Sequence, residues 1–292
     1  MSTRSPVTAA ERAVAGDALV VAPGPTLARA VVGRLADRST GGGDAASDAA
    51  RDDATDRVRL LCSPDDAAEA VTDFLTATDA ADAVADGRLA IRTETELDAS
   101  LTIGDDAVWA NVSFPSPNDD SDGSSVPDPA SLTAVGDADG ATRDAIAAAY
   151  DRRWREAQVF EVGTPARSTL LSTFRDRWPE AVETLAAVLD AADALPRDAV
   201  VGPVATCTLV AARHRLLTME LGEWTEEVGL SSRTEIARAK SRLIDAGLVD
   251  TEREPVGVGR PRHRLVPGDD RLESAPPADL LAIGRAALAD AG

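Results

Sequence analysis

The sequence predicts an α/β amino-terminal domain that is joined by a helical neck to a smaller α+β domain. Three observations predict this order. Short apolar runs alternate with helical patterns over the first hundred residues, strand patterns then vanish from about residue 142, and strand-like runs return near the carboxyl end. At 292 residues, 44% of them hydrophobic, the chain is long enough to build two domains with cores of their own.

The first domain, residues 1–140, begins with alternating strands and helices. Three apolar runs predict buried strands: ALVVA (18–22), RVRLLC (57–62) and LAIRT (89–93). Between the first two, Leu27, Val31 and Leu35 form a helical stripe. After the second strand, Ser63 as N-cap and Pro64 at the first position predict another helix, which buries its apolar side chains. This βαβα order indicates an α/β sheet.

Antiparallel strands and two loops complete the first domain. LTIG and AVWANV flank Asp105 and Asp106, so residues 101–112 predict a hairpin. Residues 38–56 and 115–129 are rich in Gly, Asp, Ser and Pro and have few apolar side chains, so both are expected to be mobile loops.

Residues 141–197 are predicted to form the helical neck. Ile146, Tyr150 and Trp154 lie four residues apart on one helix, and a second apolar stripe passes through Val182 and Leu185, in a helix that could continue from TLLSTFRDRW. These stripes could form the core or a dimer seam, and we favour the core. The candidate seams are the helix at 180–195 and the terminal ADLLAIGRAALADA in the C-terminal helix, residues 269–292.

A well-marked helix lies inside the third segment, residues 198–268. Ser232 and Glu235 form a capping box, and Gly247 can take the left-handed conformation that closes a helix. One face of this helix is apolar: Ile236, Ala239 and Leu243. The opposite face is polar: Thr234, Arg238, Ser241 and Arg242.

The surroundings of that helix predict a winged helix-turn-helix domain. Helical patterns in TLVAARHRLL (208–217) and LGEWTEEVGL (221–230) precede it, and Gly229 closes the second of these. After it, LVDTER and RHRLV predict two strands joined by EPVGVGRP. Three helices with a tight turn between the last two, followed by a β-wing, form the winged helix-turn-helix plan.

The charge distribution indicates what this domain binds. The chain has a formal charge of −20 and a single lysine, Lys240, a composition typical of proteins from a high-salt cytoplasm. Residues 231–266 nevertheless hold eight basic and five acidic side chains, a net +3, so the remaining residues carry −23. A local excess of cations in an acidic protein favours a polyanionic partner, double-stranded DNA.

The predicted DNA-binding residues come from the capped helix and the wing. They are Ser232, Arg233, Thr234, Arg238, Lys240, Ser241, Arg242, Arg260, Arg262, His263 and Arg264. Arginine suits bidentate contact with guanine, and the wing cations suit phosphates. The carboxylates beside this surface are expected to bind cations when DNA approaches: Glu223, Glu226, Glu227 and Asp245.

Catalytic and metal-binding patterns are weak in this sequence. Cys62 and Cys207 form no CxxC pair, so neither a disulfide framework nor a structural metal is expected, and no cofactor is predicted. Cys62 is interpreted as a buried small hydrophobe rather than a nucleophile. APGPTLARA lacks the phosphate-binding glycine motifs. With no apolar signal segment and no membrane span, a cytoplasmic protein is expected. Because no catalytic pair can be named, the protein is expected not to be an enzyme.

Residues 204–266 resemble the carboxyl-terminal winged helix of haloarchaeal TbsP-type transcriptional regulators. The resemblance is carried above all by ELGEWTEEVGLSSRTEIARAKSRLIDAGLVDTEREPVGVGRPRHRL. The order of domains agrees over nearly the whole chain. The resemblance implies a sequence-specific regulator of sugar-metabolism genes, linked in role to the TrmB sugar-responsive regulators. The α/β half also resembles the phospholipase-D-like effector domains found in TrmB proteins. Catalysis in that superfamily uses an HxK pair, which this chain lacks.

Three functions remain open from the sequence. The leading one is a DNA-binding regulator, active as a homodimer, whose α/β half, residues 1–140, either senses a small metabolite or another regulator or forms the dimer. The second is a small-molecule-binding enzyme that carries a winged helix, although no acid–base pair can be named for it. The third is an adaptor whose wing binds another regulator.

Overall fold

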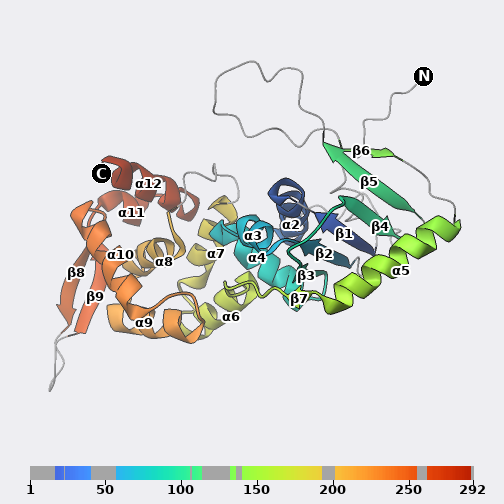
Figure 1. Ribbon diagram of the computed structural model, residues 1–292. Helices are drawn as coiled ribbons and strands as arrows, with labels where there is room; N and C mark the ends of the chain where they lie inside the picture. Colours follow the sequence, from blue (N-terminus) through green and yellow to red (C-terminus); the bar gives the residue numbers. More distant parts are fainter. Residues whose placement is uncertain are drawn as a thin grey trace, which may run out of the picture. The chain divides into compact units, whose positions relative to one another are not determined.

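A computed structural model describes residues 17–22, 24–40, 57–105, 107–113, 132–135, 140–192, 201–254 and 262–290. The chain folds into two compact units, Met1–Gly163 and Thr164–Gly292 (Figure 1). The predicted order of an α/β part followed by a helix-rich part with one hairpin is confirmed.

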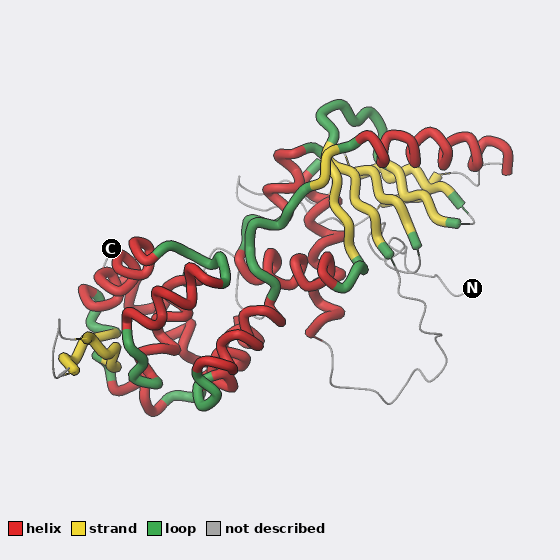
Figure 2. The backbone as a smooth tube through the Cα atoms, turned by 90° about the horizontal axis from the view of Figure 1, so that it is seen from below, coloured by secondary structure: helices red, strands yellow, loops and turns green. Residues whose placement is uncertain are grey.

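Within the described residues, the first unit contains a seven-stranded mixed sheet in the order β6-β5-β4-β1-β2-β3-β7. Figure 2 shows strands of this sheet side by side in yellow. The central strands β1, β2 and β3 are parallel, and the flanking pairs are antiparallel. The strands are β1 (Ala18–Ala22), β2 (Val58–Cys62), β3 (Leu89–Thr93), β4 (Leu101–Gly104), β5 (Val108–Ser113), β6 (Leu132–Val135) and β7 (Gln158–Val159). The three buried strands and the 101–112 hairpin therefore lie where the sequence predicts them.

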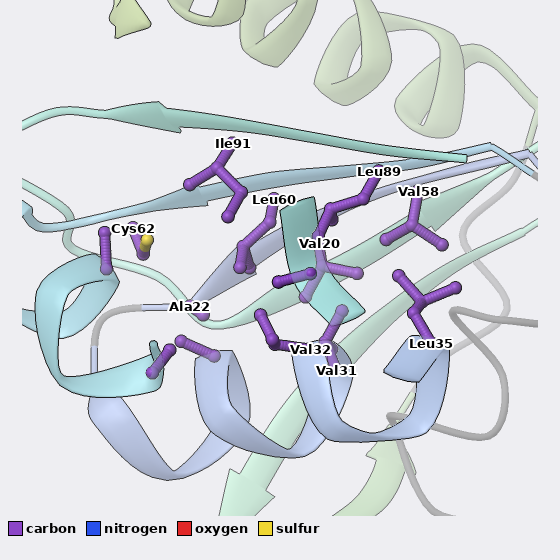
Figure 3. Packing of buried hydrophobic residues seen from close by; sticks show 14 of the residues in the cluster. Val20, Ala22, Val31, Val32, Leu35, Val58, Leu60, Cys62, Leu89 and Ile91 are labelled. Carbon is purple, nitrogen blue, oxygen red and sulfur yellow. The ribbon is translucent and has the colours of Figure 1, made fainter. Parts of the chain in front are cut away.

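Helices cover both faces of this sheet. On one face lie α2 (Pro25–Thr40), α3 (Pro64–Ala70) and α4 (Phe74–Ala85), and the other face carries α5 (Gly140–Glu156). Alternate residues of the central strands point to opposite faces, so Val20 and Leu60 pack toward Val31 and Val32 of α2 (Figure 3). Because the central strands are apolar on both faces, one sheet supplies two apolar cores.

Helix α5 is attached to the sheet by arginines as well as by apolar contacts. Tyr150 and Trp154 pack on the sheet, as the core interpretation of their stripe predicts, but no residue of α5 is fully buried. Arg92 of β3 donates a 2.7 Å hydrogen bond to the Trp154 carbonyl, and its guanidinium lies 5.2 Å from the Trp154 ring centroid. Arg153 pairs with Glu94 at 2.9 Å. Because α5 buries no side chain fully, these polar contacts provide part of its attachment to the sheet.

Local details of the first unit differ from the prediction. The helix that begins after Ser63 is two helices, because Asp73 accepts a hydrogen bond from the Thr76 amide and caps α4 as a new helix. Strands β6 and β7 were not predicted. The two-residue β7 contradicts the expected lack of strands after residue 142, because it is too short to show an alternating pattern. Helix α2 extends into the predicted 38–56 loop; the rest of that loop and the 115–129 loop lie outside the described residues.

The second unit is helical apart from one described hairpin. Its elements are α6 (Arg167–Arg177), α7 (Val182–Ala192), α8 (Pro203–Arg213), α9 (Thr218–Glu227), α10 (Arg233–Asp245), β8 (Val249–Glu254), β9 (Arg262–Pro267), α11 (Asp270–Ser274), η2 (Pro277–Asp279) and α12 (Leu280–Asp290). An aromatic cluster joins α6 to α9. The rings of Phe174 and Trp224 are 5.1 Å apart in an edge-on arrangement, and Trp178 completes the cluster.

The residues predicted as a neck are divided between the two units, since α5 belongs to the first while α6 and α7 belong to the second. Helices α6 and α7 do not form one continuous helix, because Pro179 follows Trp178 and provides no amide for helical hydrogen bonding. The candidate dimer seams are also corrected. The apolar residues of α7 and the start of α12 are buried inside the second unit: Val182, Leu185, Val188, Leu189, Leu280 and Leu281.

We predict that the aromatic cluster dominates the stability of the second unit. Trp224→Ala removes a side chain that is 1% exposed and whose Nε1 donates a 3.0 Å hydrogen bond to Thr173 Oγ1. Loss of such a core side chain costs about 3–5 kcal/mol. Denaturant unfolding in molar KCl measures the free energy, with Met219→Ala on the exposed side of the same helix as control. Equal effects of the two substitutions would contradict the role of the cluster.

Candidate nucleic-acid interface

A tight turn connects α9 to α10 and is fixed at both ends. Gly229, with φ of 73°, ends α9, and the Leu230 amide donates to the Thr225 carbonyl at 2.9 Å. The predicted capping box at the start of α10 is confirmed: the Ser232 side chain accepts from the Glu235 amide, and the Glu235 carboxylate accepts from the Ser232 amide at 2.9 Å. The hydrogen bond from the Ser232 amide, the main cause, lowers the pKa of the Glu235 carboxyl, so this cap persists at neutral pH.

Helix α10 has the two faces that its sequence predicts. Ile236 and Leu243 are buried, and the helix contacts α8 and α9. Ala239 is half-buried. The predicted polar face is exposed to solvent along the whole helix: Thr234, Arg238, Ser241 and Arg242.

A hairpin follows α10 and packs on the same domain. Strands β8 and β9 pair antiparallel with Thr251 opposite Leu265, and the buried Leu265 and Val266 fix β9 next to α8. The chain before α9 adds a further backbone contact, because the Leu265 amide donates to the Leu216 carbonyl at 2.8 Å. The two predicted strands of the wing are present. Arg260, which comes between them in the sequence, lies outside the described residues.

Two of the predicted DNA-binding arginines are held by carboxylates of the same domain. Arg233 Nε lies 2.6 Å from Glu226 Oε2, which ties the start of α10 to α9. Arg264 Nη2 lies 2.7 Å from Glu254 Oε2, and its Nη1 donates to the Arg215 carbonyl at 2.5 Å. These two guanidiniums therefore form ion pairs within the domain. Sequence periodicity alone could not reveal these pairs.

Other predicted cations are not held in this way. Arg238, Lys240, Arg242 and Arg262 form no ion pair with any residue of the described ranges. His263 is exposed on β9 between Arg262 and Arg264. Arg238 and Arg242 thus lie on the polar face of α10 and Arg262 lies on the hairpin, the surfaces that the sequence predicts to contact DNA, whereas Lys240 is partly buried.

Three of the four flanking carboxylates are already paired with arginines, and cation uptake by these carboxylates stays a prediction. Glu223 and Glu227 both pair with Arg177, at 3.1 and 3.5 Å, and Glu226 pairs with Arg233. These arginines come from α6 and α10, so the carboxylates already have counter-charges supplied by the fold.

Sequence reasoning missed one residue of this region, Arg215. The predicted helix at 208–217 runs through it, but α8 ends at Arg213 and Arg215 adopts φ of 55°. His214, next to it, closes α8 and lies 2.7 Å from Thr184 Oγ1 through Nε2. Burial lowers the pKa of His214, so this histidine is a neutral packing residue at neutral pH.

The amino-terminal unit offers no activated nucleophile at its cysteine. Cys62 is buried at the end of β2, and burial, with a smaller effect of Asp66, raises its thiol pKa to about 12. The thiol therefore stays protonated, as expected of a small buried hydrophobe. Within the described ranges, no three His, Cys, Asp or Glu side chains are placed to hold a metal ion. None of the helices in those ranges is long and apolar enough to cross a membrane.

Comparison with known proteins identifies both halves of the chain. Residues 4–165 match the family model described as "Transcriptional regulator TbsP-like, N-terminal". Residues 166–285 match the one described as "Transcriptional regulator TbsP-like, C-terminal HTH domain", and the change at 165/166 agrees with the division into two units. No curated protein and no solved structure matches the chain. The protein is therefore a member of the TbsP-like family of transcriptional regulators, with a carboxyl-terminal helix-turn-helix domain for DNA binding.

Proposed function

We propose that this protein binds DNA in a sequence-specific manner by inserting α10 into the major groove and laying the β8–β9 hairpin, as a wing, along the adjacent backbone. The observation that carries the proposal is that Arg238 and Arg242 on α10 and Arg262 on the hairpin are exposed cations that pair with no carboxylate of the described residues. Arginine donates two parallel hydrogen bonds to guanine, while hairpin cations suit phosphates.

In this proposal some of the residues contact DNA directly, and others hold the DNA-binding surface in place. Arg238 and Arg242 contact bases, and Thr234 and Ser241 add hydroxyl contacts from the same face. Lys240, Arg262, His263 and the Arg260 of the wing tip contact phosphates. Ser232 caps α10, and Arg233 and Arg264 support the surface through Glu226 and Glu254.

We further propose that the protein acts in the cytoplasm of a halophilic archaeon on genes of sugar or central carbon metabolism. A charge of −20 with one lysine supports the habitat, because a dense carboxylate surface stays hydrated in concentrated salt. The gene class rests on the resemblance to TbsP-type regulators. In this proposal the α/β unit senses a metabolite or another regulator.

A genome-wide chromatin-immunoprecipitation map tests the gene class, and a gel-shift at high KCl with the recovered fragments tests direct binding. Recovery of a common sequence motif upstream of sugar-metabolism genes is expected. Enrichment without a motif, together with no shift of purified fragments, would instead favour the adaptor function.

We predict that Arg238→Ala and Arg242→Ala weaken binding to the recovered site more than binding to random DNA. Each lost bidentate contact reduces the discrimination by about 1–3 kcal/mol. Fluorescence anisotropy on both DNAs measures the difference, and Arg175→Ala, an exposed arginine of α6, is the matched control. Equal losses on the two DNAs would reassign these arginines to phosphate contacts.

We predict a homodimer in solution. A single module of this kind contacts DNA over only about 600–1,000 Å², and two half-sites are the usual way to reach high affinity. Multi-angle light scattering in molar KCl is expected to give twice the chain mass of 30.3 kDa. A mass of one chain up to high concentration would rule out the dimer.

A further inference from the structure

Three successive helices of the second unit end with the same pattern of hydrogen bonds. After α8, α9 and α10, the amide of the third residue past the end of the helix donates to the carbonyl five residues earlier, at 2.9 Å in each case. The residue before that amide must take a positive φ. At the ends of α9 and α10 it is Gly229 and Gly247, whereas at the end of α8 it is Arg215. A side chain is unfavourable there, because Cβ crowds the backbone.

The side chain of Arg215 connects three elements that are distant in sequence. Its Nη2 lies 2.8 Å from Glu273 Oε1 of α11, and its Nη1 lies 3.9 Å from Glu252 Oε1 of β8. Hydrogen bonding to Glu273 is the main cause that raises the pKa of this guanidinium.

The backbone at the same point connects to the second strand of the hairpin. The Arg215 carbonyl accepts from Arg264 Nη1 at 2.5 Å, and the next carbonyl, of Leu216, accepts from the Leu265 amide at 2.8 Å. Both strands and the following helix thus meet at one helix end. Arg215 has the left-handed backbone conformation, and the carbonyls of Arg215 and Leu216 both accept hydrogen bonds from β9.

We infer that Arg215 is a positioning residue that fixes the hairpin against α8, so that Arg262 can reach a DNA phosphate. This inference rests on the proposed function for its effect on DNA. The side chain is half exposed and contributes little to the core, so its role concerns the orientation of the hairpin more than global stability.

The test uses Arg215→Gly in the full chain, because glycine accepts the same φ while the side-chain links are lost. Spin labels on Arg253→Cys of β8 and Ala282→Cys of α12, both exposed positions, report the hairpin position without DNA. The native cysteines, Cys62 and Cys207, are buried. The distance distribution is expected to broaden in Arg215→Gly and to stay narrow in Arg29→Ala, which removes an exposed ion pair of the amino-terminal unit. An unchanged distribution would overturn the inference.

DNA binding supplies the second measurement, as a double-mutant cycle with Arg262→Ala. Each single substitution is expected to reduce the slope of log affinity against log salt by about one, the value for one lost phosphate contact. The double variant is expected to match the single variants, because a displaced hairpin has already lost the Arg262 contact. Additive changes would mean that Arg215 does not act through Arg262. A wild-type chain that binds no specific DNA would refute the proposed function, while the label distances would still decide the positioning role.

Discussion

In the proposed function a chain of charge −20 must bind DNA, which is itself a polyanion, and this is the constraint that the surface of α10 and the hairpin has to meet. In molar salt the Debye length is about 3 Å, so repulsion between distant charges is screened and contacts at short range decide binding. A surface that works in this regime needs cations placed within reach of the partner and local carboxylates that are already neutralised. The second unit has both features, since Glu223, Glu226 and Glu227 are paired with arginines while Arg238 and Arg242 stay exposed.

The arginines of this domain therefore have two different tasks. Arg177, Arg233 and Arg264 link helices and strands to one another through carboxylates. The arginines on the polar face of α10 are exposed, and in the proposed function they contact DNA. The same use of arginine occurs in the first unit, where Arg92 and Arg153 attach α5 to the sheet. In a chain with only 3% aromatic residues, such links supplement small apolar cores, and the Phe174, Trp178 and Trp224 cluster concentrates several of the aromatics in one place.

Much of this structure could be predicted from the sequence because the signals are local. The apolar runs at 18–22 and 58–62, the capping box at Ser232 and the glycine at 247 each act within a few residues. The parts that failed depend on distant partners. Strand β7 exists only because it pairs with β3, and the apolar faces of α7 and α12 are covered by their own unit rather than by a second chain. Arg215 could not be found because its sequence continues a helical pattern. Its positive φ is accompanied by ion pairs with Glu252 and Glu273 and by a hydrogen bond from Arg264 to its carbonyl, all from residues distant in sequence.

The central claim is that contacts at α10, rather than a general attraction of cations to phosphates, carry specific binding. The most direct test is the affinity for a recovered genomic site and for random DNA between one and three molar KCl. Each phosphate contact contributes a slope of about −0.9 in log affinity against log salt. The account predicts that specific affinity falls only weakly over this range while binding to random DNA is lost. An equally steep decline on both DNAs would contradict it and would mean that the domain is only a phosphate clamp.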